Sequence, residues 1–522
     1  MISLQSLLEI LPEANGLRIE DVPVISVTDH SGRVQPGAVF VAVRGTSADG
    51  HDYLEEVMKK NPAAIIAQRV APAEYPGLWI QVPDTRVVLG RLAARFAGDP
   101  AASLRVIGVT GTNGKTTVTH FIHALIERAM IKCGMIGTIK IHDGKTLRDA
   151  SHTTPGAVEL QSILRTMKEN GCRAVAMEAS SHGLEQGRCQ GIPFRVGVFL
   201  NLTQDHLDYH KTMEAYLDAK KVLFEQMADE GRDGVAVINI DDPAGEKLAA
   251  EYADRLKVVT FGFSPKADFR AGEVRPSVRG QTFALEAKGR SYLVRIPFVG
   301  RFNVLNAIAA LASVQALGMR VRDVIKSLED MRQTAGRMEY VGGDRISVFV
   351  DYAHTPDAVE KACATLRALN PNRLITVFGC GGDRDRSKRP LMGQAAANHS
   401  NICIVTSDNP RNEDPEAIIE EILPGLGTTA YEVVLDRREA INKAIEISLP
   451  SDIILIAGKG HETYQEVKGK RFQFDDREVA RRALEEKRKR DEADFLKRQE
   501  EREEREKKRG PGDRPPRDYD RD

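Results

Sequence analysis

Short apolar runs that alternate with longer helical stretches constrain the fold of this chain most strongly. Four of them are RVIGVT (105–110), RAVAMEA (173–179), RVGVFLNL (195–202) and GVAVINI (234–240). Strands buried on both faces of a parallel sheet have such nearly continuous apolar runs. Strands that alternate with helices form layered α/β domains, so we predict an α/β fold.

The same pattern divides the 522 residues into three predicted domains. A first α/β unit covers 1–98, where VPVISVT, AVFVAV and AAIIAQ are separated by turns. A central unit covers 99–334 and changes at 268–298 to the alternation typical of antiparallel hairpins, before a helix predicted over 303–317. A third α/β unit covers 335–487, with strands predicted in ISVFVDY, LITVFG, ICIVTS and IILIAG.

The end of the chain differs in composition. From Arg481 to Asp522, 30 of 42 residues are charged, sixteen basic and fourteen acidic. We assign 488–522 to a charged tail, whose first part can form one solvated helix and whose Pro/Gly-rich end is predicted to be disordered.

Charge and composition exclude several classes of function. The 74 basic and 75 acidic residues give a net charge of −1, which removes the bulk electrostatic argument for binding nucleic acid or an anionic membrane. No run approaches the roughly 20 apolar residues of a membrane helix, and the start MISLQSLLEILPEANG lacks the basic region of a secretory signal. The six cysteines show no CxxC spacing. We therefore expect a cytoplasmic protein without membrane insertion or a nucleic-acid partner.

The string RVIGVTGTNGKTT predicts a phosphate-binding turn. A strand runs into a turn, and a helix is expected to begin near Lys115, which would point backbone N–H groups at one place. Gly111 and Gly114 allow close backbone approach, while Lys115 and Thr116 supply a cation and a magnesium-binding hydroxyl. Val109 stands where the general P-loop pattern requires glycine, so this is a compressed variant. The alternative is a tight strand–helix turn with a surface lysine.

Two strands end in side chains that can bind a metal. Glu178 ends RAVAMEA, and NLTQDHLDYH after the next strand contains His206. A carboxylate and an imidazole beside phosphate oxygens can hold a divalent ion that keeps several waters, so we predict a Mg²⁺ site. Alone, His206 could instead be a helix-cap histidine.

Nine ordered motifs resemble those of the Mur ligase family. They are GTNGKTT, SHTTPGAVELQ, MEASSHGLEQGR, NLTQDHLDYH, AYLDAKKVLF, DYAHTPD, FGCGGDRDRSKRPLMG, SDNPRNEDP and AGKGHETYQ. The resemblance covers about residues 20–485. It implies a small α/β N-terminal domain for a uridine nucleotide, a central P-loop-type ATPase sheet and a Rossmann-like C-terminal domain for the incoming amino acid. We expect a monomer.

The resemblance implies an ATP-dependent acid–amino-acid ligase of peptidoglycan synthesis, and hence of cell wall biogenesis, cell shape and division. ATP would phosphorylate the terminal carboxylate of UDP-N-acetylmuramoyl-L-alanyl-D-glutamate, and the amine of meso-2,6-diaminopimelate would attack the acyl phosphate. Charge builds on phosphoryl oxygens, so cations and N–H groups fixed in advance should dominate catalysis. The alternatives are a relative that adds lysine, folylpolyglutamate synthesis, and a non-catalytic nucleotide-binding scaffold that docks through its tail.

The resemblance also implies the residues that bind ATP and its metal. ATP would contact Gly111, Thr112, Asn113, Gly114, Lys115, Thr116, Thr117, Asn306 and Arg337, with Asp351 and His354 nearby. The implied catalytic residues are Lys115, Glu178, His206 and Lys220, and the implied Mg²⁺ ligands are Thr116, Glu178, His206 and a CO₂-derived carbamate on Lys220. Spacing alone favours a solvated Lys220 on an amphipathic helix, whereas a carbamate needs a buried amine of depressed pKa.

The two organic substrates have their own implied residues. For the UDP-sugar peptide they are Ser31, Thr46, Ser47, Ala48, Thr153, Thr154, Ser181, Gln186 and Arg188. For diaminopimelate they are Arg384, Asp408, Asn409, Pro410, Arg411, Gly458 and Glu462. The Arg411 guanidinium can pair with the distal carboxylate, which lysine lacks, and Glu462 can accept from the ammonium group. Taken alone, DNPR is an Asx-Pro turn.

Three positions depart from the family pattern. His152 replaces the usual asparagine before Thr153, and 29–33 reads Asp-His-Ser-Gly-Arg where the family has Asp-Ser-Arg. Ala335 replaces the proline before Gly-Arg. The first two positions bear on contacts with the nucleotide sugar.

Overall fold

The computed structural model describes residues 2–45, 48–231, 233–331, 333 and 335–508, with side chains described to 504. Thr46 and Ser47 therefore lie outside the described residues. The chain forms two compact units. The first comprises Met1–Arg275, Gln281–Pro297 and Arg301–Met331, and the second comprises Pro276–Gly280, Phe298–Gly300 and Arg332–Asp522. The predicted α/β fold is confirmed, while the predicted domain limits remain predictions.

The first unit begins with a four-stranded parallel sheet. Its strands are β1 (Ser26–Thr28), β2 (Ala38–Val41), β3 (Ala64–Ala67) and β4 (Trp79–Gln81), in that order. Its helices are α1 (Leu4–Leu8), α2 (Leu54–Met58) and α3 (Thr85–Phe96). The Asp84 side chain caps α3 by accepting from the N–H groups of Arg86 and Val87. Leu89 and Leu92 of α3 share one buried core with the strands.

An eleven-stranded sheet forms the centre of the first unit, in the order β15-β14-β13-β12-β11-β10-β5-β9-β6-β7-β8. The predicted strands appear as β5 (Arg105–Thr110), β9 (Ala174–Glu178), β10 (Phe194–Phe199) and β11 (Val235–Asn239). β5 pairs in parallel with both β9 and β10, so all three strands end at one edge. The predicted hairpin region gives β13 (Phe269–Ser277), β14 (Gly280–Ala287) and β15 (Arg290–Ile296), with β14 and β15 antiparallel. The remaining strands are β6 (Cys133–Ile136), β7 (Lys140–His142), β8 (Leu147–Asp149) and β12 (Lys257–Gly262).

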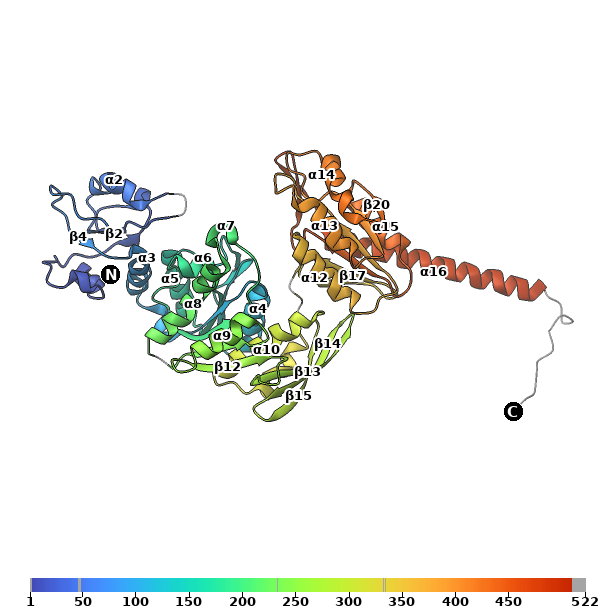
Figure 1. Ribbon diagram of the computed structural model, residues 1–522, viewed down its shortest axis with the longest axis horizontal. Coiled ribbons are helices and arrows are strands. Elements are labelled where there is room, and N and C mark those ends of the chain that lie inside the picture. Colours follow the sequence, from blue (N-terminus) through green and yellow to red (C-terminus); the bar gives the residue numbers. More distant parts are fainter. Residues whose placement is uncertain (1, 46–47, 232, 332, 334, 509–522) are drawn as a thin grey trace. The chain divides into compact units, whose positions relative to one another are not determined.

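Helices pack against both faces of this sheet (Figure 1). α4 (Lys115–Arg128) and α10 (Arg301–Ala316) pack against each other, α4 on β5, β6 and β9 and α10 on β10 to β12. The other helices are α5 (Ala157–Glu169), α6 (Ser181–Glu185), α7 (Leu207–His210), α8 (Met213–Asp229), α9 (Pro243–Glu251) and α11 (Val321–Val324). α4 follows β5 after only four residues, so the loop between them lies at the carboxyl edge of the sheet. Ligands bind at this edge in open α/β sheets.

The second unit is built on a six-stranded sheet in the order β16-β17-β21-β18-β19-β20. The strands are β16 (Glu339–Gly342), β17 (Ser347–Asp351), β18 (Leu374–Phe378), β19 (Ile402–Val405), β20 (Ala430–Val433) and β21 (Ile453–Ala457). Two core clusters cover the sheet, one with α12 (Pro356–Arg367), α13 (Lys388–Ala397) and α14 (Pro415–Ile422), the other with α15 (Arg437–Ile447) and the start of α16 (Asp476–Lys508). A hairpin of β22 (Tyr464–Val467) and β23 (Lys470–Gln473) precedes α16.

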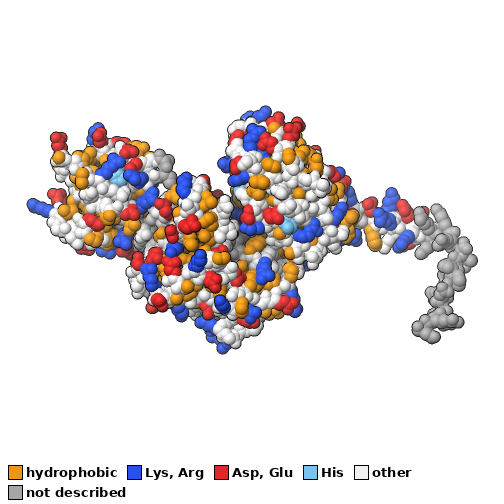
Figure 2. Space-filling view, in the orientation of Figure 1, with side chains coloured by type: hydrophobic (Ala, Val, Ile, Leu, Met, Phe, Trp, Pro, Cys, Tyr) orange, Lys and Arg blue, Asp and Glu red, His pale blue; other side chains and the backbone are white. Residues whose placement is uncertain are grey.

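The far part of α16 is a charged helix that leaves the core. Its side chains are exposed from Lys489 to Glu504, and Figure 2 shows Lys, Arg, Asp and Glu side chains along it. This agrees with a solvated helix in the first part of the charged tail. Within the described residues, no helix combines the length and the apolar character needed to cross a membrane.

Candidate functional site: a phosphate loop and an amino-acid cluster

The loop between β5 and α4 has the backbone expected of a phosphate-binding turn. Gly111 and Gly114 have φ angles of 144° and 92°, which favour glycine. A Cβ atom on Gly114 would lie 2.6 Å from Asn306 Oδ1, which places the predicted ATP residue Asn306 against the loop. The first N–H groups of α4 have no partner within the helix, so the start of this helix can receive an anion. Thr116 and Thr117 lie in its first turn.

Residues after β10 hold the loop, and sequence reasoning did not single them out. Asn201 accepts from the Asn113 N–H at Oδ1 (2.8 Å) and donates from Nδ2 to the Asn113 carbonyl (3.0 Å). The Thr112 hydroxyl donates to the Thr203 carbonyl (3.2 Å). The loop is therefore fixed in shape before any ligand arrives, which lowers the ordering cost of binding.

Two lysines meet at the carbonyl of Gly111. Lys115 Nζ donates to the carbonyls of Gly111 and Thr112, both at 2.9 Å, and Lys220 Nζ donates to Gly111 at 3.0 Å. Lys220 is only 1% exposed, and its ammonium lies 4.0 Å from the centre of the Tyr216 ring. The solvated position favoured by spacing alone is thus wrong, because α8 turns this lysine toward the loop. Burial, and then the Lys115 charge, hold the pKa of Lys220 well below its usual value, although Asp205 acts in the opposite direction.

Glu178 is buried beside the same loop. It is 1% exposed, and its Oε2 accepts from the Thr116 hydroxyl (3.1 Å) and from the Thr138 hydroxyl (3.0 Å). Its Oε1 accepts from the Thr138 N–H (2.8 Å). Thr138, which follows β6, therefore fixes both oxygens of the predicted metal carboxylate, and the sequence motifs did not single it out.

This contact predicts a measurable role for Thr138. Thr138→Val removes the hydroxyl donor but keeps the N–H donor, so the apparent Mg²⁺ affinity should fall about 10- to 100-fold, as is usual when a partner of a metal ligand is lost. Magnesium titration of ATP turnover measures this, and Thr138→Ser should restore the wild-type curve. An unchanged curve for Thr138→Val would show that the hydroxyl does not act on Glu178.

His206 and Glu178 contact different residues. Its ring is 45% exposed, lies 3.6 Å from Asp205 and packs edge-on against His182 at a centroid distance of 4.9 Å. Among the described residues, no group of three or more His, Cys, Asp or Glu side chains can hold a metal by itself. The touching oxygens of Thr116 and Glu178 are nevertheless hard ligands of the kind that suits Mg²⁺, which usually also takes phosphate and water oxygens. The donor set fits a magnesium ion shared with a nucleotide.

Several residues implied for the UDP-sugar peptide surround Glu178. Thr154 donates from its hydroxyl to the Glu178 carbonyl (2.9 Å), and Arg188 donates to the Thr154 carbonyl (2.8 Å) and to Gln186 Oε1 (3.0 and 2.6 Å). Thr153 contacts the Thr138 hydroxyl at 3.0 Å. These four implied residues therefore form one polar group beside the phosphate loop.

The other implied residues of this substrate make different contacts. Ser181 pairs with the buried His210 ring (3.0 Å). Ser31 begins a short 3₁₀ turn, and its carbonyl accepts from Lys60 Nζ at 2.9 Å. Ala48 is exposed, and its carbonyl accepts from the Gly45 N–H. His152 is exposed and contacts only the neighbouring Ser151 hydroxyl, at 3.2 Å, among the bonds seen in the described chain.

The second unit holds the other implied nucleotide residues. The Arg337 guanidinium lies 4.9 Å from the centre of the Tyr352 ring. Asp351 accepts from the N–H groups of Met338 (2.6 Å) and Ala353 (2.8 Å), and burial raises the pKa of its carboxyl against the opposing effect of Arg337. His354 contacts the Tyr352 carbonyl at 2.7 Å.

The residues implied for diaminopimelate lie in the loops after β18, β19 and β21, and we call this group the amino-acid cluster. Asp408 and Asn409 are buried, and Asn409 Nδ2 donates to Glu462 Oε2 at 3.0 Å. A Cβ atom on Gly458, whose φ is 121°, would lie 2.9 Å from Asp408 Oδ2, so only glycine leaves room for this carboxylate. Pro410 is also buried.

Two arginines border the amino-acid cluster. Arg411 donates to the Gly382 carbonyl (2.7 Å), and its Nε lies 3.7 Å from Glu466 Oε2. A Cβ atom on Gly381 would lie 2.9 Å from Arg411 Nη1 and 3.8 Å from Arg384 Cγ, so both side chains border Gly381. Arg384 is exposed. Such an arrangement of acids and guanidinium groups suits a substrate with both ammonium and carboxylate groups.

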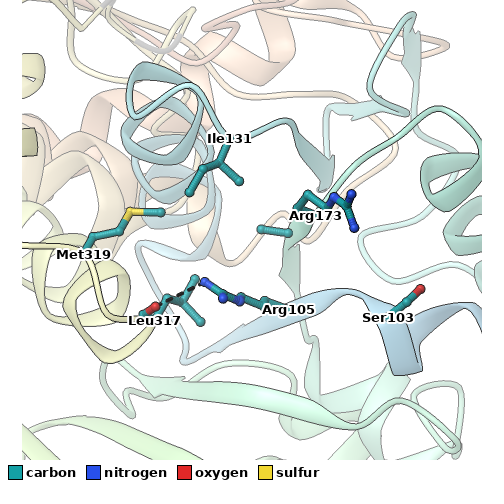
Figure 3. Close-up of a pocket in the computed structure, with 7 residues that line it drawn as sticks. Ser103, Arg105, Ile131, Arg173, Leu317 and Met319 are labelled. Carbon is teal, nitrogen blue, oxygen red and sulfur yellow. Dashed lines mark hydrogen bonds between the residues drawn. The ribbon is translucent and has the colours of Figure 1, made fainter.

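A cavity of about 350 Å³ lies in the first unit, at the end of β5 opposite the phosphate loop (Figure 3). It is lined by Ser103, Arg105, Ile131, Arg173, Ala174, Leu317 and Met319. Arg105 begins β5, whereas the phosphate loop follows the other end of that strand, and the Arg105 guanidinium donates to the Leu317 carbonyl at 3.3 Å. This cavity therefore contains none of the predicted functional residues.

Comparison with known proteins identifies the class. Residues 26–97 match the Mur ligase family catalytic domain, 109–314 the Mur ligase middle domain, and 336–460 the Mur ligase glutamate ligase domain. Together with the phosphate loop, these matches define an ATP-dependent ligase that joins an acid to an amino acid. The chain belongs to the Mur ligase family, as the sequence motifs predicted.

Two relatives carry the same name, UDP-N-acetylmuramoyl-L-alanyl-D-glutamate–2,6-diaminopimelate ligase. The protein of Syntrophomonas wolfei is 42% identical over 468 residues, covering 89% of this chain and 95% of its own. That of Halalkalibacterium halodurans is 41% identical over 489 residues, covering 93% and 99%. A solved structure with this name is 36% identical with a TM-score of 0.74, covering 92% and 99%. A MurF ligase of Thermotoga maritima in complex with ADP shares the fold, at 20% identity and a TM-score of 0.54 over 88% and 96%.

Proposed function

We propose that this chain adds meso-2,6-diaminopimelate to UDP-N-acetylmuramoyl-L-alanyl-D-glutamate, at the expense of ATP, in peptidoglycan synthesis. The observation that carries the proposal is that relatives named for this activity align over nearly the whole chain. The phosphate loop, the buried Lys220 and the amino-acid cluster with Arg411 would supply the groups that such a reaction needs.

The proposed reaction has two steps. A carboxylate oxygen of the substrate attacks the γ-phosphorus of ATP, the bond to the β-phosphate breaks, and ADP leaves. The amine nitrogen of the amino acid then attacks the acyl carbon, phosphate leaves with the carboxylate oxygen, and the nitrogen loses a proton. The N–H groups at the start of α4 and the Lys115 ammonium would hold the phosphoryl oxygens, where negative charge develops in both steps.

The metal and the modified lysine are part of the proposal. Thr116, Glu178, His206 and a carbamate on Lys220 would hold Mg²⁺, which would offset the charge of the phosphate oxygens during transfer. The lowered pKa of Lys220 supports the carbamate, because only a neutral amine reacts with CO₂. Thr153, Thr154, Gln186 and Arg188 would orient the substrate carboxylate beside the loop.

The proposed setting is a monomeric enzyme of the cytoplasm, with no nucleic-acid partner, that serves cell wall biogenesis and thereby cell shape and division. The near-zero net charge gives no electrostatic reason for a nucleic-acid partner, and the names of the relatives support a role in cell wall biogenesis.

Phosphate release tests the proposal. With ATP, Mg²⁺ and the UDP-dipeptide, the rate should rise steeply on addition of meso-diaminopimelate and little on addition of L-lysine. If only L-lysine raised the rate of phosphate release, the chain would be a lysine-adding ligase. If no amino acid raised that rate, a non-catalytic binding scaffold would be favoured.

A further inference from the structure

Lys459 is buried among the residues of the amino-acid cluster. It stands between Gly458 and Gly460 after β21, and its side chain is 0% exposed. Its Nζ lies 2.8 Å from Asn409 Oδ1, 3.5 Å from Asp408 Oδ1 and 3.5 Å from Glu462 Oε2. A lysine with no exposed surface acts on a substrate only through the groups that it contacts.

The first effect of Lys459 is to orient Asn409. The Asn409 Oδ1 atom accepts from Lys459 Nζ and from the Glu466 N–H (2.9 Å), so the amide nitrogen is turned toward Glu462 and donates to its Oε2 at 3.0 Å. Lys459 and Asn409 thus both engage Oε2. The Oε1 atom of Glu462 is then the oxygen that can accept from an incoming ammonium group.

The second effect of Lys459 is on charge. The Asp408 and Glu462 side chains are 9% and 18% exposed, so two carboxylates with little solvent share one small region. The other buried cation nearby, Arg437, is held by Asp476 through bonds of 2.8 and 2.7 Å. Lys459 is therefore a cation in direct contact with both carboxylates and offsets part of their negative charge, to which Arg437 also contributes.

We propose that Lys459 is a positioning residue for amino-acid recognition, which holds Asn409 and Glu462 in the arrangement that receives the substrate ammonium group. The inference rests on the proposed function, because it concerns the residues that are proposed to bind diaminopimelate. It assigns Lys459 no contact with substrate.

The test is steady-state kinetics of Lys459→Met, with Lys470→Met as control. Lys470 begins β23 and is exposed, so the control makes the same chemical change at a residue outside the amino-acid cluster. Lys459→Met should raise KM for meso-diaminopimelate about 10- to 100-fold, the usual consequence of losing hydrogen bonds to a charged group. KM for ATP and for the UDP-dipeptide should stay within about twofold, and Lys470→Met should match the wild type.

A milder variant covers the risk that removal of a buried cation prevents folding. Lys459→Gln keeps a donor for Asn409 but removes the charge, so its KM for meso-diaminopimelate should lie between those of the wild type and Lys459→Met. The proposal is overturned if a folded variant keeps the wild-type KM, if all three KM values rise together, or if neither variant folds, since a purely structural role explains the last two results. Failure of the proposed function is distinguishable, because wild-type enzyme would then release no phosphate in response to meso-diaminopimelate.

Discussion

Replacing Lys220 with alanine should lower kcat about 10²- to 10³-fold, the loss typical when one group that stabilises transition-state charge is removed. The amine is buried against the Gly111 carbonyl and the Tyr216 ring, and it lies beside the loop where phosphate is proposed to bind. Alanine cannot form a carbamate, so an anionic ligand of the proposed metal is lost. The measurement is the rate of ATP turnover at saturating substrates, together with thermal unfolding.

Two comparisons make the Lys220 result specific. Lys221→Ala changes the next residue, whose ammonium pairs with Glu251 at 2.5 Å on the surface, and its rate should remain near that of the wild type. Small carboxylates such as acetate or formate should partly restore Lys220→Ala by replacing the missing anion. A near-wild-type rate for Lys220→Ala would remove the carbamate from the mechanism.

Replacing Arg411 with alanine should raise KM for meso-diaminopimelate about 30- to 1,000-fold, which corresponds to about 2–4 kcal/mol for an unpaired substrate carboxylate. The preference over L-lysine should disappear, because lysine has no distal carboxylate to lose a partner. The Arg411 backbone has a φ of 50°, where alanine meets the same steric cost, and the backbone bond from its N–H to the Glu466 carbonyl (3.0 Å) can persist. Competition between the two amino acids in one reaction measures this selectivity.

A nearby arginine provides the control for Arg411. The Arg471 guanidinium lies 4.4 Å from the centre of the Tyr464 ring. We expect Arg471→Ala to leave the selectivity for the amino acid unchanged. ATP binding should be nearly intact in both variants. If Arg411→Ala kept the wild-type selectivity, the assignment of the DNPR motif (408–411) to the distal carboxylate of diaminopimelate would be wrong.

The fold was predictable where burial dictates residue type. RVIGVT coincides with β5 and the other central apolar runs match their strands to within a few residues, because strands buried on both faces admit few polar side chains. The phosphate loop was equally visible, since the positive φ angles of Gly111 and Gly114 favour glycine and Lys115 follows them at the start of the helix. Short edge strands such as β4 and β20 were not predicted, because β4 is only partly buried and β20 is exposed, so neither has a continuous apolar run.

The contacts within the site were less predictable. Thr138 and Glu178 are 40 residues apart, Lys459 and Asn409 are 50 apart, and Asn113 and Asn201 are 88 apart. Each pair involves a polar loop residue with no periodic pattern, and only the three-dimensional sheet edge brings its members together. The burial of Lys220 was unpredictable for a similar reason. Helical spacing identifies the face of α8 on which Lys220 lies, but it does not reveal that the phosphate loop covers that lysine.

Isotope transfer tests the central claim most directly. The UDP-dipeptide is labelled with ¹⁸O in both oxygens of the terminal carboxylate and incubated with ATP, Mg²⁺ and meso-diaminopimelate, and the released phosphate is analysed by mass spectrometry. Because one carboxylate oxygen leaves with the phosphoryl group, each phosphate should carry one ¹⁸O atom, in an amount equal to the amide formed. Phosphate without label would mean that water receives the phosphoryl group, and that result would contradict an acyl phosphate ligase.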